Sequence, residues 1–359
     1  MKVAIVGAGP SGLSCALELE RHGIFPVVFE QRHRPGELFN HSAAVLKLFT
    51  RPFDPLEHLR ESYGVDVCPI SRLKYITMKS AKKKVTVTGD LGYFIKRGND
   101  NDSVETQLCD RLKSKVVANT KADYLELSRR FDYVVVASGN YNASRTEGVW
   151  SLLYPSMLIG GTVIGSFDIA NLVMWVDTRY SKTAYAYLAP IEKKRAFLGL
   201  VVPDSTPEEA RLSWSMFWRM ENHPYNLLNE ILIQHNAGFV YPHQVGNILF
   251  VGIAGGFLEP FLGFGMLSSI KSGVLAARAI ATGRSFEDLI FQLKEDMLHS
   301  MVMRELFDDV KNDQYDLLLK VLSAPGLKQS IYNTNIDFVR MGTAAAGHFK
   351  ALVNIIKNK

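Results

Sequence analysis

A glycine-rich turn between a strand and a helix constrains the fold of this chain more than any other feature. The turn reads Gly7-Ala8-Gly9-Pro10-Ser11-Gly12 and directly follows the apolar run 2–6. The first glycine of such a turn permits a tight bend, the second lets the backbone approach a pyrophosphate, and the third lets the helix pack on the strand. The helix expected over 11–21 then presents free N–H groups and a positive dipole end to the phosphates.

An acidic residue completes this unit. A second strand over 26–29 ends at Glu30, which Gln31 follows. A carboxylate in that place accepts hydrogen bonds from the ribose hydroxyls of an adenosine, and it repels a 2′-phosphate. A glycine turn alone is a weak signal, but two strands, a helix and the acidic residue in register predict a bound dinucleotide. The unit by itself does not distinguish FAD from NAD.

Composition excludes several other classes of protein. Of the 359 residues, 47% are hydrophobic and 21% are charged, which is ordinary for a globular chain. The net charge of +5 is small and its basic residues are dispersed, so we expect no nucleic-acid partner. The three cysteines form no CxxC pair, so we expect neither a metal site nor a disulfide framework. The apolar stretch 151–176 is interrupted by Pro155 and Asp168, which predicts core rather than a membrane span, and with no secretory signal the expected location is cytoplasmic.

The middle of the chain changes to the two-residue rhythm of strands. The runs 173–176, 183–188 and 195–202 show it, and their connections are turn-like. This pattern predicts a separate antiparallel sheet. A helix follows, for which Thr206 is the expected cap and Glu209 completes a capping box.

A second glycine-rich segment lies far downstream of the first. The strand-like run 248–251 leads into Gly252 and Ile253. The turn 259–266 follows, and it leads into a helix rich in small residues. In this arrangement the sequence resembles the geranylgeranyl reductase family, within the larger group of flavoproteins typified by para-hydroxybenzoate hydroxylase. The resemblance implies bound FAD, with a helix N-terminus approaching the pyrimidine edge of the flavin.

The resemblance extends in order over residues 1 to about 285. It implies cofactor-binding roles for Gly263, Phe264 and Gly265 in the turn 259–266, and for Ser138 and Gly139 at the end of a strand. It also implies such roles for Arg97, at the end of a segment along the cofactor, and for Val116, whose backbone would contact adenine. The stretch 185–190 is similar to the one that lines the lipid cavity of geranylgeranyl reductases, which implies substrate-binding roles for Tyr185, Tyr187 and Pro190. On their strand the two tyrosines either line the flavin side or belong to the core.

The chain also departs from the family. Ile253 stands where the family has an aspartate that hydrogen-bonds the ribityl chain, and the segment 38–46 has no counterpart of the family's cysteine. Tyr187 replaces a tryptophan and Ala189 replaces a phenylalanine. The resemblance therefore supports the family's FAD binding in this chain better than it supports the family's reduction of a prenyl double bond. No residue is assigned as the catalytic acid.

The expected fold is α/β, with a Rossmann-like FAD-binding domain of the glutathione-reductase-like superfamily, an antiparallel β-sheet substrate domain and a C-terminal helical region. We place the discontinuous FAD-binding domain at 1–150 and 240–285, the substrate region at 151–239 and the helical region at 286–359. The expected activity is reduction of an apolar, isoprenoid-like substrate through FADH2, with NADPH or a ferredoxin-like protein as donor. The alternatives are an FAD monooxygenase of an aromatic substrate and a flavin-binding protein without turnover.

The last segment has an amphipathic pattern. Within 344–359, Phe349, Leu352, Val353 and Ile356 gather on one helical face, and basic residues surround them. The pattern predicts a helix that closes the core or a dimer contact. The alternative is a peripheral membrane contact through which an apolar substrate enters.

Overall fold

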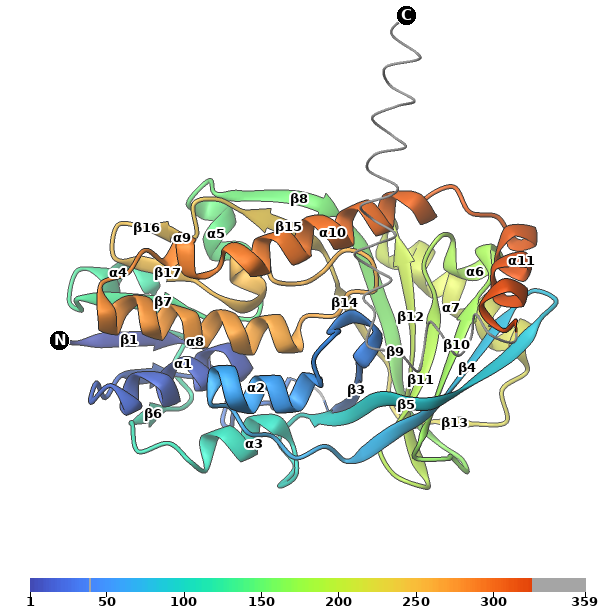
Figure 1. Ribbon diagram of the computed structural model, residues 1–359, viewed down its shortest axis with the longest axis horizontal. Helices are drawn as coiled ribbons and strands as arrows, with labels where there is room; N and C mark the ends of the chain where they lie inside the picture. The colour runs from blue at the N-terminus through green and yellow to red at the C-terminus, as the bar shows by residue number, and fades with distance from the viewer. Residues whose placement is uncertain (39, 325–359) are drawn as a thin grey trace, which may run out of the picture.

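The computed structural model describes residues 1–38 and 40–324, which form an α/β fold around two sheets (Figure 1). The first sheet lies beside the long helices α1 and α8, and the second sheet is larger (Figure 1). The predicted C-terminal amphipathic helix over 344–359 lies outside the described residues. Within the described part of the chain, no helix is long and apolar enough to cross a membrane.

The first sheet, here called the cofactor sheet, has the order β16-β17-β7-β1-β2-β6. Its members are β1 (Val3–Val6), β2 (Val27–Phe29), β6 (Val116–Val117), β7 (Tyr133–Val136), β16 (Gln244–Val245) and β17 (Ile248–Phe250). All pairs are parallel except β16 with β17. The strands are short apolar runs because helices cover parallel strands on both faces.

Two helices pack closely beside the cofactor sheet. Helix α1 (Pro10–Arg21) begins with proline at its first position, where the missing N–H costs nothing. Helix α8 (Met266–Thr282) ends at a left-handed glycine, and its buried side is mostly small residues. A Cβ at Gly273 would lie 2.1 Å from the carbonyl oxygen of Ser11, so only glycine permits this approach. The Ser14 hydroxyl also donates to the Ile270 carbonyl at 3.0 Å, which joins the two helices.

The second sheet, here called the large sheet, has the order β13-β9-β12-β11-β10-β4-β5-β3, with β14 paired to β9. Its strands are β3 (His41–Leu46), β4 (Ser71–Ser80), β5 (Lys84–Arg97), β9 (Ser156–Ile164), β10 (Asn171–Val176), β11 (Ala186–Pro190), β12 (Arg195–Pro203), β13 (Asn226–Leu227) and β14 (Ile231–Gln234). Neighbouring strands are antiparallel apart from β10 and β4, which run parallel.

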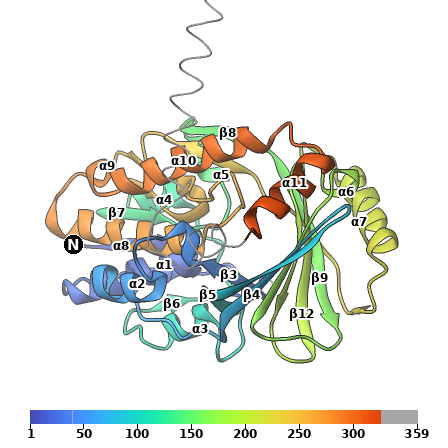
Figure 2. The ribbon, with the colours of Figure 1, turned by 45° about the vertical axis from the view of Figure 1, so that its right-hand side comes forward.

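The two faces of the large sheet have different neighbours. Helix α7 (Pro207–Glu221) covers the outer face, where Trp214 and Phe217 pack with Trp175 (Figure 2). Its expected cap is present, because Thr206 and Glu209 form the reciprocal capping box. On the opposite face, Tyr187 and Ala189 of β11 belong to a hydrophobic cluster that includes Phe264, which lies just before α8.

The boundary between the sheets differs from the expected one at residue 150. Strands β3, β4 and β5 lie within 1–150, yet they pair in the large sheet. The decisive contact is the parallel pairing of β4 with β10, in which Tyr75 lies opposite Asn171. Period-two alternation indicates a strand but does not identify its partner, so this placement was not visible in the sequence.

The described residues form further elements. They are α2 (Pro55–Tyr63), α3 (Val104–Cys109), α4 (Tyr124–Ser128), α5 (Asn142–Thr146), α6 (Thr178–Ser181), α9 (Phe286–Leu289), α10 (Phe291–Phe307), α11 (Asn312–Leu322), the 3₁₀ turns η1 (Lys47–Phe49) and η2 (Gly252–Gly255), and the strand pair β8 (Trp150–Tyr154) with β15 (Ala237–Val240). The predicted helical region beyond residue 286 is therefore helical over its described part, through α9, α10 and α11.

Candidate cofactor site

The parallel strands of the cofactor sheet all end at one edge, and the predicted cofactor residues gather there. Gly7 follows β1, Glu30 follows β2, Ser138 and Gly139 come shortly after β7, and Gly252 comes shortly after β17. In open α/β sheets this carboxyl edge is where ligands bind. The parallel strands therefore bring these residues, which are far apart in sequence, to one edge of the sheet.

The three glycines of the first turn have three different environments. A Cβ at Gly7, whose φ is +107°, would lie 2.3 Å from the carbonyl oxygen of Ala137. A Cβ at Gly12 would lie 2.0 Å from the carbonyl oxygen of Gly7. A Cβ at Gly9, by contrast, would have no heavy atom of the described chain within 4 Å apart from Gly9 and its two chain neighbours. Gly7 and Gly12 are thus required by packing, whereas the space beside Gly9 is free for a ligand.

The N-terminus of α1 faces this space without a side-chain cap. Gly9 is the N-cap residue, and Pro10 supplies no N–H. Among the described residues, no side chain caps this end of the helix. Backbone N–H groups and the helix dipole at such an end attract an anion, as the sequence predicted for a pyrophosphate.

Glu30 is buried and its carboxylate is held by backbone groups. One oxygen accepts from the Ala8 N–H at 2.9 Å, and the other accepts from the Arg32 N–H at 2.9 Å. Each carboxylate oxygen can accept a second hydrogen bond, so the fixed group retains acceptor capacity for ribose hydroxyls. Gln31 is exposed beside it.

The second glycine segment interlocks with the first. Gly252 has φ +60°, and a Cβ there would lie 2.6 Å from the hydroxyl oxygen of Ser11. Its N–H donates to the Ser272 hydroxyl of α8 at 3.0 Å. Ile253 follows in η2 and is partly buried. The position at which the family resemblance expects an aspartate therefore lies next to the first turn of α1.

Residues 259–265, here called the flavin loop, connect η2 to α8. Gly263 has φ +70°, and a Cβ there would lie 2.4 Å from the His235 Nε2 atom. Burial lowers the pKa of His235, which favours the neutral ring beside the loop. Phe264 packs against Phe49 with 6.1 Å between ring centroids. Gly265 is the N-cap residue of α8, and among the described residues no side chain makes a capping hydrogen bond at that helix end.

The two tyrosines assigned to the substrate face the flavin loop rather than α7. The Tyr185 hydroxyl donates to the Leu262 carbonyl, and burial raises the pKa of Tyr185 well above its ordinary value. The ring of Tyr187 lies over Gly199 and packs with Phe197 at 5.7 Å between centroids. Tyr185 therefore lies against the flavin loop, and both tyrosines pack in one hydrophobic cluster with Leu262.

Pro190, Val116 and Arg97 were also predicted as site residues, and each lies in a different part of the fold. Pro190 is buried at the end of β11, and Val116 is partly buried in the edge strand β6. The Nε of Arg97, which the resemblance places along the cofactor, donates to the buried carboxylate of Glu105 at 2.7 Å. Its guanidinium is therefore engaged with α3. The helix that follows Arg97, α3, begins where Ser103 caps it.

Sequence reasoning missed Glu259 and Ser300 as site residues. Glu259 lies inside the flavin loop, and its carboxylate accepts from the hydroxyl of Ser300 in α10. A carboxylate directly before proline in a glycine-rich turn was the available signal for Glu259. Nothing in the local pattern indicates Ser300, because the contact spans a sequence separation of 41 residues.

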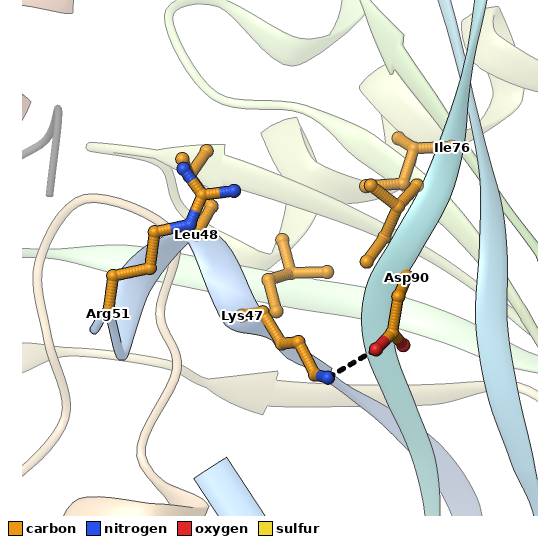
Figure 3. A pocket seen from close by; sticks show the side chains of 7 residues that line it. Lys47, Leu48, Arg51, Ile76 and Asp90 are labelled. Atoms are coloured by element: carbon orange, nitrogen blue, oxygen red, sulfur yellow. Dashed lines mark hydrogen bonds and ion pairs between the residues drawn. The ribbon is translucent and has the colours of Figure 1, made fainter. Parts of the chain in front are cut away.

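A small cavity lies beneath η1, away from the glycine turn. It is lined by Leu46, Lys47, Leu48, Arg51, Ile76, Asp90 and Leu91, and its volume is about 20 Å³. Figure 3 shows the side chain of Lys47 reaching Asp90. In this ion pair the Lys47 nitrogen lies 2.6 Å from an Asp90 carboxylate oxygen. A second ion pair joins Lys47 to Asp54 at 2.7 Å. A cavity of this volume holds about one water, so it is not a substrate site.

Comparison with known proteins supports the reading of the first turn. Residues 5–44 match the family of NAD(P)-binding Rossmann-like domains. The glutamate synthase [NADPH] small chain of Halomonas elongata is 40% identical over 67 residues, which are 19% of this chain and 14% of that protein. The thiamine thiazole synthase of Thermotoga maritima is 58% identical over 36 residues, which are 10% of this chain and 14% of that protein. These relatives are similar only over a short segment.

Solved structures are similar over nearly the whole chain. A geranylgeranyl bacteriochlorophyll reductase-like protein from Thermoplasma acidophilum superposes with a TM-score of 0.71 at 14% identity, covering 96% of this chain and 98% of that one. A flavin-dependent brominase gives 0.69 at 15% identity and covers 100% of both chains. A flavoprotein/dehydrogenase from Cytophaga hutchinsonii gives 0.64 at 14% identity, covering 98% of this chain and 100% of that one. The resemblance seen in the sequence is confirmed at the level of the fold: the chain has the α/β fold, with a Rossmann-like dinucleotide-binding domain, of geranylgeranyl reductase-like proteins and flavin-dependent halogenases.

Proposed function

We propose that this protein is an FAD-dependent oxidoreductase that reduces an apolar, isoprenoid-like substrate. The observation that carries the proposal is the open space beside Gly9, at an uncapped helix end and beside the fixed carboxylate of Glu30. Gly7 and Gly12 of the same turn are closely packed against other backbone atoms, whereas the place beside Gly9 where a pyrophosphate approaches is left free. The similarity of the whole fold to flavin-dependent proteins supports FAD over NAD as the occupant.

The protein's own residues would bind and orient the cofactor. The turn 7–12 would hold the pyrophosphate, Glu30 the adenosine ribose, and the N-terminus of α8 the pyrimidine edge of the ring. When bound, the flavin supplies the electrons for reducing the substrate. Tyr185 keeps its proton, because burial raises its pKa, and its hydroxyl anchors the flavin loop through Leu262. Tyr187 and Phe197 would form an apolar wall that excludes water from the substrate.

A second candidate is an FAD monooxygenase that acts on an aromatic substrate. An oxygenase of 2-methyl-3-hydroxypyridine-5-carboxylic acid shares the fold with a TM-score of 0.56 at 15% identity and covers 94% of this chain. The aromatic side chains facing the flavin loop suit a flat substrate as well as an isoprenoid one. The two candidates differ in whether reduced flavin is used by an apolar double bond or by oxygen.

The first experiment is the absorption spectrum of the purified protein before and after dithionite. We expect the visible bands of oxidised FAD, bleached on reduction. A colourless protein that takes up no added FAD contradicts both candidates and supports a chain without flavin turnover. NADPH consumption with matching oxygen uptake favours the monooxygenase, and anaerobic reoxidation by an apolar alkene favours the reductase. Comparing NADPH with a reduced ferredoxin-like protein in the same assay identifies the electron donor.

Replacing Ile253 tests whether the missing carboxylate at this position weakens FAD binding. Because Ile253 lies in η2 next to α1, Ile253→Asp should tighten FAD binding by about 1–3 kcal/mol, the worth of a charge-assisted hydrogen bond. Titration of the apoprotein with FAD measures the effect. Ile253→Asn is the matched control and should gain less, because its hydrogen bond is neutral. Weaker binding by both variants would contradict the assignment of Ile253 to the ribityl chain.

A further inference from the structure

Glu259 occupies the centre of the flavin loop. Its side-chain carboxylate accepts from the N–H groups of Phe261 and Leu262, each at 2.8 Å, and of Phe264 at 3.0 Å. The Ser300 hydroxyl of α10 donates to the same carboxylate. Three backbone donors of a single turn therefore converge on one internal anion.

The backbone of Glu259 closes the same loop. Its carbonyl oxygen accepts from the Gly263 N–H at 3.0 Å, and its own N–H donates to the Phe264 carbonyl at 3.0 Å. Pro260 has no N–H to satisfy. Every N–H from residue 260 to residue 264 is thus either missing or bound by Glu259. Within the flavin loop, Glu259 is therefore the residue that accepts the hydrogen bonds of the backbone N–H groups of residues 261–264.

We infer that Glu259 is a positioning residue that shapes the flavin loop before the cofactor arrives. This inference rests on the proposed function, because the loop is useful only if a flavin lies against it. With its four N–H groups bound internally, the loop presents a fixed surface and directs the free N–H groups of the α8 N-terminus to the ligand. A site that is formed in advance saves the entropy of ordering it during binding.

The loop is also tied to its surroundings through this residue. Ser300 accepts from the Phe261 N–H at 3.1 Å, so α10 contacts both the carboxylate and the backbone that it organises. Phe261 further packs against Phe307 of α10, with 5.0 Å between ring centroids. On the other side, Tyr185 donates to the Leu262 carbonyl. Removal of the carboxylate should therefore loosen the loop while its two neighbours remain in place.

The test compares Glu259→Ala with the wild type, using two measurements on the full chain. The first is hydrogen exchange at the amides of residues 261–264 in the apoprotein, which should become about tenfold faster when a charge-assisted bond is lost. The second is the dissociation constant of FAD, which should rise about tenfold because the loop must be ordered on binding. Asp309→Ala removes an exposed acid just beyond α10 and should change neither quantity.

Acetate provides a rescue that separates positioning from general stability. Glu259→Ala removes the equivalent of one acetate ion, so added sodium acetate should restore slow exchange and FAD affinity, with chloride at equal ionic strength as the control. Glu259→Gln keeps one acceptor and should give intermediate values, and it serves if the alanine variant does not fold. If FAD affinity and exchange in both variants match the wild type, the inference about Glu259 is overturned. If the wild type itself takes up no FAD, the proposed function fails, whatever the exchange results.

Discussion

Gly9→Val is expected to yield a folded protein that no longer retains FAD. The backbone of Gly9 has φ −82° and ψ −177°, which any residue adopts, and a Cβ there would meet no heavy atom within 4 Å apart from its chain neighbours. The valine side chain would instead fill the space of the pyrophosphate. FAD binding should weaken at least about 100-fold, which corresponds to about 2.8 kcal/mol.

The measurement combines flavin content after gel filtration with the thermal midpoint of the apoprotein. We expect the flavin to be lost while the apoprotein midpoint stays close to that of the wild type, and Gly9→Ala should show a smaller loss of affinity. Gly12→Val is the contrasting variant, because its Cβ would lie 2.0 Å from the Gly7 carbonyl oxygen and should disrupt folding itself. Stoichiometric flavin in Gly9→Val would show that the cofactor site has been misplaced.

Gly273→Ala should destabilise the protein, although alanine is the better helix former. In an ordinary helix interior this substitution gains about 1 kcal/mol. Here the new methyl group would lie 2.1 Å from the Ser11 carbonyl oxygen and 2.7 Å from the Ser14 hydroxyl oxygen, so α1 and α8 must move apart. We expect a net loss of about 1–3 kcal/mol in the free energy of unfolding, as for other overpacked contacts.

Chemical denaturation of the apoprotein measures this free energy. Ala281→Gly, near the end of the same helix, is the control and should cost at most about 1 kcal/mol through helix propensity alone. FAD affinity should also fall in Gly273→Ala, because Ser11 belongs to the glycine turn 7–12, which would hold the pyrophosphate. If Gly273→Ala is instead more stable than the wild type, the close approach of α1 and α8 is contradicted.

Local geometry explains why the cofactor turn could be recognised from sequence. The roles of Gly7, Gly9 and Gly12 follow from distances of a few residues, and the structure places each glycine in the environment that its role requires. The position of Glu30 is equally local, because the strand that precedes it ends at the same edge as β1. The order of strands and helices, and hence the α/β class, follows from such short-range patterns.

Tertiary structure alone decided which distant groups meet. A strand pattern in the sequence does not select a partner, and only the structure pairs β4 with β10. Only the structure shows that Arg97 binds Glu105, whose buried carboxylate requires a partner. Ser300 reaches Glu259 only after α10 has packed over the flavin loop. The sequence by itself therefore determined the glycine turn 7–12 and the class of fold. Hydrogen bonds and packing between distant segments decided how the flavin loop is held.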